Sequence, residues 1–330
     1  MQQSTLKKLS EILGLSISTV SRALKDHPDI SSATKAKVKD LAKEMEYQPN
    51  AYAVQLRTRQ SNAFGILVPS IRNFFYDSFI AAIEEDARKK GFYVLIMQSG
   101  ENPETEAANL QLLRSNIVKG VFVALTMETV DMRPFQRMED MKIPLVFVDR
   151  VPDVSGYYKV YVADEESARL SAEAIIAKGK KKVLALFSHK HLALSKRRED
   201  AFVKVFEEKA PDVELIIEHP VETEPAYQIT REILAGENRP DVVFCMGDLI
   251  MMGVMKAVYE KGLKVPDDIS IISISNGIIP TLFQPQITHV VTSGYKLGKL
   301  AFQQMSKRLK NEPISEDVSV ESFLVEGGSL

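Results

Sequence analysis

From residue 63 onward, short apolar runs alternate with longer amphipathic segments, and this alternation is the strongest limit on the folds open to the chain. Apolar runs bounded by turn residues indicate buried strands, whereas apolar positions three and four apart indicate helices. Regular alternation of the two predicts an α/β fold of parallel sheets with helices on both faces. The expected strands are 64–68, 93–98, 120–125, 145–149, 158–163, 182–187, 214–218, 242–246, 270–275 and 289–292.

Ten strands fit two doubly wound sheets better than one, and 330 residues exceed what a single core usually supports. The break near residues 157–164 separates the two halves. We expect the helix after Thr292 and the final segment 319–325 to cross back, so that neither half is continuous in the sequence. The predicted N-terminal subdomain covers about 62–158 and 293–318, and the predicted C-terminal subdomain covers about 162–289 and 322–330.

The first 60 residues follow a different pattern. They carry ten basic and six acidic side chains, a balance of +4, although the whole chain carries −2. A basic segment on an acidic body suggests that this segment meets a polyanion. Apolar spacing predicts one helix over 5–13 that ends at Gly14, a second over 17–24, and a third that begins near residue 32. Two short helices joined by so tight a turn are typical of an all-α helix-turn-helix domain.

The second of these helices is the element expected to enter the major groove of DNA. Arg22 can donate two hydrogen bonds to guanine, and short hydroxyl side chains suit phosphate contacts. The predicted DNA-binding domain covers 1–47, and its predicted contacts are Thr5, Ser16, Ile17, Ser18, Thr19, Ser21 and Arg22. An ordinary helical hairpin stays open as an alternative, because such hairpins are common and a balance of +4 lies within normal scatter.

Residues 48–61 are expected to form a hinge between the head and the body. Pro49 ends the third helix, and Asn50 can cap a two-turn helix from Ala51 onward. So short a helix is unstable alone in water, which suggests that it folds on binding. Leu56 would then be an apolar wedge in the minor groove and Arg57 a phosphate contact. A plain linker is the alternative.

Two segments together resemble the lactose-repressor/galactose-repressor family. TLKKLSEILGLSISTVSRAL (5–24) resembles the helix-turn-helix of that family, and QPNAYAVQLRT (48–58) resembles its hinge helix. The resemblance continues to the C-terminus. It implies a homodimeric transcriptional regulator, generally a repressor, that binds a palindromic double-stranded DNA operator. It also implies that paired hinge helices wedge the central base step with Leu56, with Ala53 beside it. Val54 departs from the basic residue usual in the hinge.

The resemblance further implies a periplasmic-binding-protein-like body with a small-molecule effector between its subdomains. The identity of the effector is unknown, and a sugar or sugar derivative is the candidate class. Parallel sheets bind ligands beyond the carboxyl ends of their strands, which favours polar and aromatic residues at strand ends. The effector-site candidates at strand ends are Asn73, Phe74, Phe75, Asp149, Asp248, Ser275 and Asn276, and the resemblance of REDAF (198–202) to a family motif adds Arg198. Ser275 stands where the family often has an aspartate, and Gly247 replaces an asparagine, which argues against an ordinary neutral sugar. Helix capping for Asp248 and a solvated position for Arg198 stay open.

Other function classes find less support in the sequence. Cys245 is the single cysteine, and His189 and His191 lack a third ligand, so we expect no metal site and no cofactor. Neither a nucleotide-binding fingerprint nor a catalytic constellation is present, so an enzyme is not expected. The N-terminus lacks an apolar signal core, and no run reaches the roughly 18 apolar residues of a membrane span. We therefore expect a cytoplasmic protein without membrane contact. The alternatives are a solute-binding receptor without DNA binding and a sugar- or nucleotide-metabolising enzyme.

Overall fold

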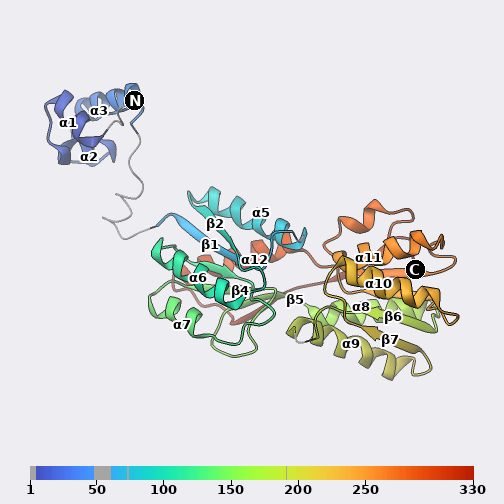
Figure 1. Cartoon of the computed structure of the whole chain (residues 1–330). Coiled ribbons are helices and arrows are strands. Elements are labelled where there is room, and N and C mark those ends of the chain that lie inside the picture. Colours follow the sequence, from blue (N-terminus) through green and yellow to red (C-terminus); the bar gives the residue numbers. More distant parts are fainter. Residues whose placement is uncertain (1–4, 48–60, 73, 191) are drawn as a thin grey trace. The chain divides into compact units, whose positions relative to one another are not determined.

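The computed structural model of the chain describes residues 5–47, 61–72, 74–190 and 192–330 (Figure 1). The chain divides into two compact units, Met1–Ser61 and Asn62–Leu330. The first unit contains helices, and the second contains two predominantly parallel sheets with helices packed against them. The predicted fold class is therefore confirmed.

The first unit, which we call the head, has three described helices: α1 (Leu6–Leu13), α2 (Ile17–Leu24) and α3 (Ser32–Glu44). Its small core consists of Leu9, Val20, Ala23, Val38 and Ala42. Each helix begins at a hydroxyl residue that accepts a hydrogen bond from the backbone N–H three residues later. Gly14 ends α1 in the left-handed conformation, at φ 63°, which a residue without a β-carbon adopts at little cost.

The first sheet of the body has the strand order β11-β5-β4-β3-β1-β2, and every pair in it is parallel. Its strands are β1 (Ala63–Val68), β2 (Tyr93–Gln98), β3 (Val121–Val123), β4 (Leu145–Val148), β5 (Lys159–Val162) and β11 (Asp317–Val320). Its helices are α5 (Phe74–Lys89), α6 (Pro103–Ser115), α7 (Arg133–Asp140) and α12 (Gly294–Leu309). This sheet and its helices form the N-terminal subdomain.

Helices lie on both faces of this sheet because alternate residues of a strand point to opposite faces. Phe64 and Ile66 of β1 join the cluster that contains side chains of α5 and α12. Ala63 and Leu67 of the same strand join the cluster that contains side chains of α6 and α7. Burial of every residue of β1 follows from this double cover.

The second sheet has the order β12-β10-β9-β8-β6-β7, in which only the β10–β12 pair is antiparallel. Its strands are β6 (Lys182–Leu186), β7 (Glu214–Glu218), β8 (Val242–Cys245), β9 (Ser270–Ser275), β10 (Thr288–Val291) and β12 (Phe323–Val325). The helices that follow its strands or lead into them are α8 (Asp164–Ala177), α9 (Ala193–Lys209), α10 (Thr223–Ala235), α11 (Asp248–Glu260) and the short η1 (Ile279–Leu282). Together they form the C-terminal subdomain.

The chain crosses between the two sheets three times: after β5, after β10, and between β11 and β12. Two details differ from the sequence analysis. The first sheet extends past the expected limit at residue 158, because β5 pairs with β4 and β11. The expected final segment 319–325 is two strands in different sheets, because the chain passes from one sheet to the other at residues 321–322. Each subdomain is therefore built from segments that are separated in the sequence, and three chain crossings connect the two.

Helices α5 and α12 approach closely because α12 presents glycines to α5. A β-carbon on Gly298 would lie 2.6 Å from the carbonyl oxygen of Phe79 and 2.7 Å from Cβ of Ala82. Since neither neighbour is the end of a flexible side chain, we expect Gly298→Ala to separate the helices and to lower the free energy of unfolding by about 1–3 kcal/mol. Denaturant titration of the full chain measures this change.

Gly236 supplies the matched control, because it has negative φ and the nearest atom to an added β-carbon would be 3.4 Å away. Gly236→Ala should change the free energy of unfolding by less than about 0.5 kcal/mol. Equal effects of the two substitutions would contradict the close approach of α5 and α12.

Candidate functional site

The outer face of α2 carries the predicted DNA contacts of the head. Val20 and Ala23 point into the core, while Ser18 and Arg22 are exposed. Ile17 is 49% exposed, one residue after the cap of the helix. Its exposed side chain suits its predicted role, contact with a base edge, which stays a prediction.

The hydroxyl groups at the start of α2 already bind one another. Ser16 Oγ accepts a hydrogen bond from the backbone N–H of Thr19 at 3.1 Å and lies 2.8 Å from the hydroxyl oxygens of both Ser18 and Thr19. Thr5 Oγ1 accepts from the backbone N–H of Lys8 at 3.3 Å in the same way at α1. These hydroxyls therefore hold the helix starts, and each retains an exposed or partly exposed side chain. The phosphate contacts of Ser16, Thr19 and Ser21, the base contact of Ser18 and the DNA contact of Thr5 stay predictions.

Four predicted DNA contacts, Asn50, Ala53, Leu56 and Arg57, lie outside the described residues, as does the effector candidate Asn73. Their roles stay predictions.

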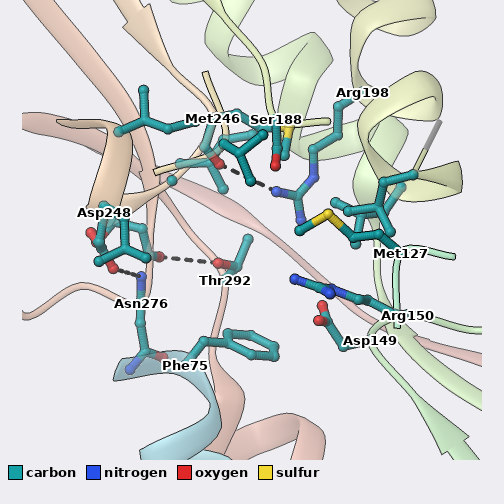
Figure 2. Close-up of a pocket in the computed structure, with 18 residues that line it drawn as sticks. Phe75, Met127, Asp149, Arg150, Ser188, Arg198, Met246, Asp248, Asn276 and Thr292 are labelled. Atoms are coloured by element: carbon teal, nitrogen blue, oxygen red, sulfur yellow. Dashed lines mark hydrogen bonds between the residues drawn. The ribbon is translucent and has the colours of Figure 1, made fainter. Parts of the chain in front are cut away.

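The body contains a cavity of about 150 Å³ between its two subdomains (Figure 2). Its wall includes six of the eight predicted effector residues: Phe75, Asp149, Arg198, Asp248, Ser275 and Asn276. Most of these follow the carboxyl ends of strands, as the rule for parallel sheets requires. Phe74 is 37% exposed and is not part of the wall, because successive residues of a helix point in different directions and Phe75 is the one that lines the cavity. A larger hollow of about 640 Å³ is lined by charged side chains that already form ion pairs with one another. It is therefore the weaker candidate for an effector site.

Arg198 enters the cavity from α9 and is held by an ion pair. Its Nε donates to Asp164 Oδ1 at 2.9 Å, and its NH1 donates to the carbonyl oxygen of Met246 at 3.3 Å. Asp164 also binds the neighbouring Arg197 through its other oxygen, at 2.6 Å. Both Arg198 and Asp164 are buried, so a solvated position for Arg198 is excluded. Asp164 is the first residue of α8, and its side chain does not cap that helix. Its two carboxylate oxygens instead bind Arg197 and Arg198.

Asp149 follows β4 in the left-handed conformation, at φ 58°. Its Oδ2 accepts a hydrogen bond of 2.7 Å from the hydroxyl of Tyr76 on α5. Burial raises the pKa of the Asp149 carboxyl above its usual value, while the positive charge of Arg150 opposes this. A non-glycine residue in this conformation is uncommon, and it directs this carboxylate to the cavity wall.

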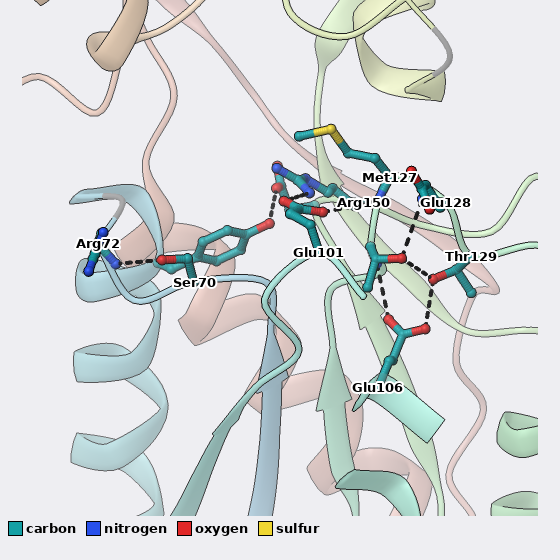
Figure 3. Close-up of polar contacts among 11 residues, drawn as sticks. Ser70, Arg72, Glu101, Glu106, Met127, Glu128, Thr129 and Arg150 are labelled. Carbon is teal, nitrogen blue, oxygen red and sulfur yellow. Dashed lines mark hydrogen bonds and ion pairs between the residues drawn. The ribbon is translucent and has the colours of Figure 1, made fainter. Parts of the chain in front are cut away.

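Arg150 is a cavity residue that the sequence analysis missed. It adjoins Asp149 in the wall, and its NH1 lies 2.6 Å from Glu101 Oε1 (Figure 3). The sequence offered one signal for Arg150, which is that it directly follows the strand-end candidate Asp149. Glu101 itself is 49 residues away in the sequence, and no local pattern announces this pairing.

Asp248, at the start of α11, accepts a hydrogen bond from the Ser275 hydroxyl and one from the backbone N–H of Asn276. It makes no capping bond to its own helix, so the capping alternative does not describe it. Burial raises the pKa of the Asp248 carboxyl, and the bond from Ser275 opposes that rise. Asp248 and Ser275 therefore form one hydrogen-bonded pair at the end of the second sheet.

The Asn276 side chain joins the two subdomains. Its Nδ2 donates to the Phe74 carbonyl oxygen and to Ser78 Oγ, both at 3.1 Å, and its Oδ1 accepts from the Gly294 backbone N–H at 3.0 Å. These partners belong to the first turns of α5 and α12. Asn276 lines the cavity as predicted, but its amide is occupied by these contacts, so a direct effector contact through the amide would have to replace them.

Two carboxylates hold the loop that follows β3 (Figure 3). Glu101 Oε2 accepts from the backbone N–H of Met127 at 3.0 Å. Glu106 Oε1 accepts from the backbone N–H of Thr126 at 3.0 Å, and its Oε2 accepts from Thr129 Oγ1 at 2.7 Å. Met127 lines the cavity. These bonds therefore fix one part of its wall from behind.

In the described part of the chain, no helix is long and apolar enough to cross a bilayer.

Comparison with known protein families gives two matches. Residues 5–50 match the bacterial regulatory proteins of the lacI family, and residues 172–330 match the periplasmic binding protein-like domain. The first match covers the described head, and the second covers most of the C-terminal subdomain together with α12 and β11 of the N-terminal subdomain.

Similar proteins over nearly the whole chain are repressors. The chain is 28% identical to the HTH-type transcriptional repressor PurR of Vibrio atlanticus over 312 residues, which is 94% of this chain and 93% of the relative. It is 26% identical to the ribose operon repressor of Halalkalibacterium halodurans, covering 94% of this chain and 92% of that one. Such relatives are regulators, in agreement with the expectation of a non-enzyme.

Solved structures show the same fold. The lac repressor dimer bound to operator and the anti-inducer ONPF superposes with a TM-score of 0.88 at 22% identity, over 99% of each chain. A periplasmic binding protein/LacI transcriptional regulator from Alkaliphilus metalliredigens, complexed with D-xylulofuranose, gives a TM-score of 0.71 at 20% identity, over 82% of this chain and 99% of that one.

Glu106 generates a prediction about pH. It is 1% exposed, and burial raises its pKa from 4.5 to about 7. The folded state therefore holds a proton that the unfolded state releases between pH 4.5 and 7, and stability falls as the pH rises through this range. We expect Glu106→Gln, which carries no charge, to remove a penalty of about 3 kcal/mol at pH 8.

Denaturant titrations of the wild type and Glu106→Gln at pH 5 and pH 8 measure this difference. The advantage of the variant should be larger at pH 8. Glu104→Gln on the exposed side of the same helix is the control, with an effect that does not depend on pH in this way. A constant difference between the wild type and Glu106→Gln would contradict the raised pKa.

Proposed function

The chain belongs to the lactose-repressor/galactose-repressor family of DNA-binding transcriptional repressors, and from this membership we propose that it acts as a homodimer on a palindromic operator, under the control of a small molecule bound in the cavity between its subdomains. The observation that carries the proposal is that one chain contains two features: a helix α2 whose predicted DNA contacts are exposed or partly exposed, and a cavity lined by residues of both subdomains.

The head supports sequence-specific DNA binding. The Arg22 side chain is 58% exposed, and its nearest carboxylate, Asp29, is 3.9 Å away and 63% exposed. So weak a surface pair leaves the guanidinium able to turn toward a guanine edge in the major groove. Ser18 and Ile17 lie on the same exposed face, and they offer a hydroxyl and an apolar contact to neighbouring bases.

Exposed apolar side chains on the body support a homodimer. Tyr93 and Ile96 are 51% and 47% exposed on β2, which is an edge strand of the first sheet. On the second subdomain, Tyr259 and Leu282 are 55% and 72% exposed. Large apolar side chains and an open strand edge are features that proteins normally cover. A two-fold dimer would present two heads and so read a palindrome.

The cavity supports control by a small molecule. Asp149 and Arg150 reach it from the first sheet, while Arg198 and Asp248 reach it from the second subdomain. A ligand that touches both subdomains stabilises one arrangement of them over another, which changes the DNA affinity only if the two arrangements bind DNA differently.

The decisive experiment captures genomic fragments with the purified full chain at low salt and sequences them. We expect enrichment of a palindromic motif, and a dimer in solution by analytical ultracentrifugation. A dimer that enriches no duplex would contradict the proposal and favour the solute-receptor alternative.

Arg22→Ala should cost about 1–3 kcal/mol of operator binding and relax the preference at one guanine per half-site. Binding to a set of single-base operator variants measures both effects. The matched control is Lys25→Ala at the exposed C-cap of the same helix, which should weaken all duplexes alike. An unchanged base preference in Arg22→Ala would remove Arg22 from base recognition.

Arg198→Ala should abolish the response of operator binding to the effector while operator binding without effector persists. Arg197→Ala is its control, because Arg197 binds the same Asp164 but does not line the cavity. Titrations of operator binding, with and without the metabolite indicated by genes beside the bound sites, measure the response. A full response in Arg198→Ala would exclude it from the effector site.

A further inference from the structure

Most polar side chains of the cavity wall already have partners within the protein. Arg198 binds Asp164 and a carbonyl oxygen, and Arg150 binds Glu101. The Ser275 hydroxyl donates to Asp248, and the Thr292 hydroxyl donates to the Ser275 carbonyl oxygen at 3.2 Å. A ligand with many hydroxyl groups needs wall groups that can form new hydrogen bonds, and burial of an unmatched hydroxyl is unfavourable.

Apolar side chains form another part of the wall. Leu192 and Leu194 lie at the start of α9, and Val221, which precedes α10, is 38% exposed. Met127 lines the cavity from the loop after β3 in the first subdomain, and it packs against the hydrophobic cluster of the second. Figure 2 shows its thioether lying across the cavity beside the Arg198 guanidinium. A methionine side chain is flexible and adapts to apolar shapes.

The remaining polar capacity is concentrated at one place. Asp149 uses Oδ2 for Tyr76, so its other oxygen can still accept a hydrogen bond. Arg150 and Arg198 each have N–H groups beyond those in the contacts above. All three residues line the cavity, and Figure 2 shows the Asp149 carboxylate next to Arg150, with the Arg198 guanidinium on the same side of the cavity. Together they can bind one polar group of a ligand.

We infer that the cavity binds a small molecule with one polar end and an apolar body, and that Met127 determines this preference. The polar end meets Asp149, Arg150 and Arg198, and the body lies against Met127, Leu194 and Val221. This inference rests on the proposed effector role of the cavity. It assigns a ligand class distinct from a polyhydroxylated sugar.

Three probes with the same six-membered carbon ring test the ligand class: cyclohexanecarboxylate and cyclohexanol carry one polar group each, and myo-inositol carries six hydroxyls. Because the chain has no tryptophan, isothermal titration calorimetry of the full-length protein is the suitable measurement. We expect at least one of the two singly substituted rings to bind at least tenfold more tightly than myo-inositol. Equal or tighter binding of myo-inositol, or no binding of either singly substituted ring at 20 mM, would overturn the inference.

Variants test the role of Met127. Met127→Gln has a similar length and should lower the affinity for the preferred ring at least fivefold, whereas Met127→Leu should retain it. Met141→Gln is the control, because Met141 is 57% exposed and lies outside the cavity wall. Circular dichroism verifies that each variant is folded. Unchanged affinity in Met127→Gln would remove Met127 as the determinant.

Operator binding without ligand separates this inference from the proposed function. If the wild type binds its enriched duplex but prefers myo-inositol, only the ligand class is wrong. If the wild type binds no duplex, the proposed function fails, whatever the rings do.

Discussion

The ion pair between Asp164 and Arg198 is the contact on which the arrangement of the cavity depends. Asp164 is the first residue after the chain crosses from the first sheet to the second, and its carboxylate holds two adjacent arginines of α9. Removing one member of a buried ion pair generally costs about 3–5 kcal/mol, because the other charge is left without a partner. Here the pair also fixes where the Arg198 guanidinium stands. The residue at which the chain enters the second subdomain, Asp164, therefore also positions the positive charge of Arg198 in the cavity.

The other polar groups follow the same rule. Glu101 holds Arg150, Tyr76 binds Asp149, and Ser275 binds Asp248, each within or beside the wall. Preorganised groups of this kind lose little freedom when a ligand arrives, and they leave few unmatched donors or acceptors in the cavity. Selectivity then comes from what the wall leaves unsatisfied and from its apolar surface. Ser275 is an example, because its hydroxyl is already bound to Asp248.

Local patterns predicted the elements well and the pairings poorly. Alternation in the sequence located the strands because buried parallel strands are short apolar runs. The strand-end rule, with Arg198 added from the family resemblance, brought six candidates to one cavity. The partners of those candidates were not predictable, since Asn276 binds Phe74, 202 residues away, and Arg150 binds Glu101 across 49 residues.

Asn276 gives the body a physical means of relating its two subdomains. Its backbone N–H binds Asp248 in the cavity wall, while its side chain binds the first turns of α5 and α12. One residue thus contacts both a wall carboxylate and two helices of the other subdomain. A ligand changes an equilibrium only by the difference in its affinity for the two states, so contacts with both subdomains matter more than tight binding to one. The wall, lined from both sides and joined at Asn276, meets that condition.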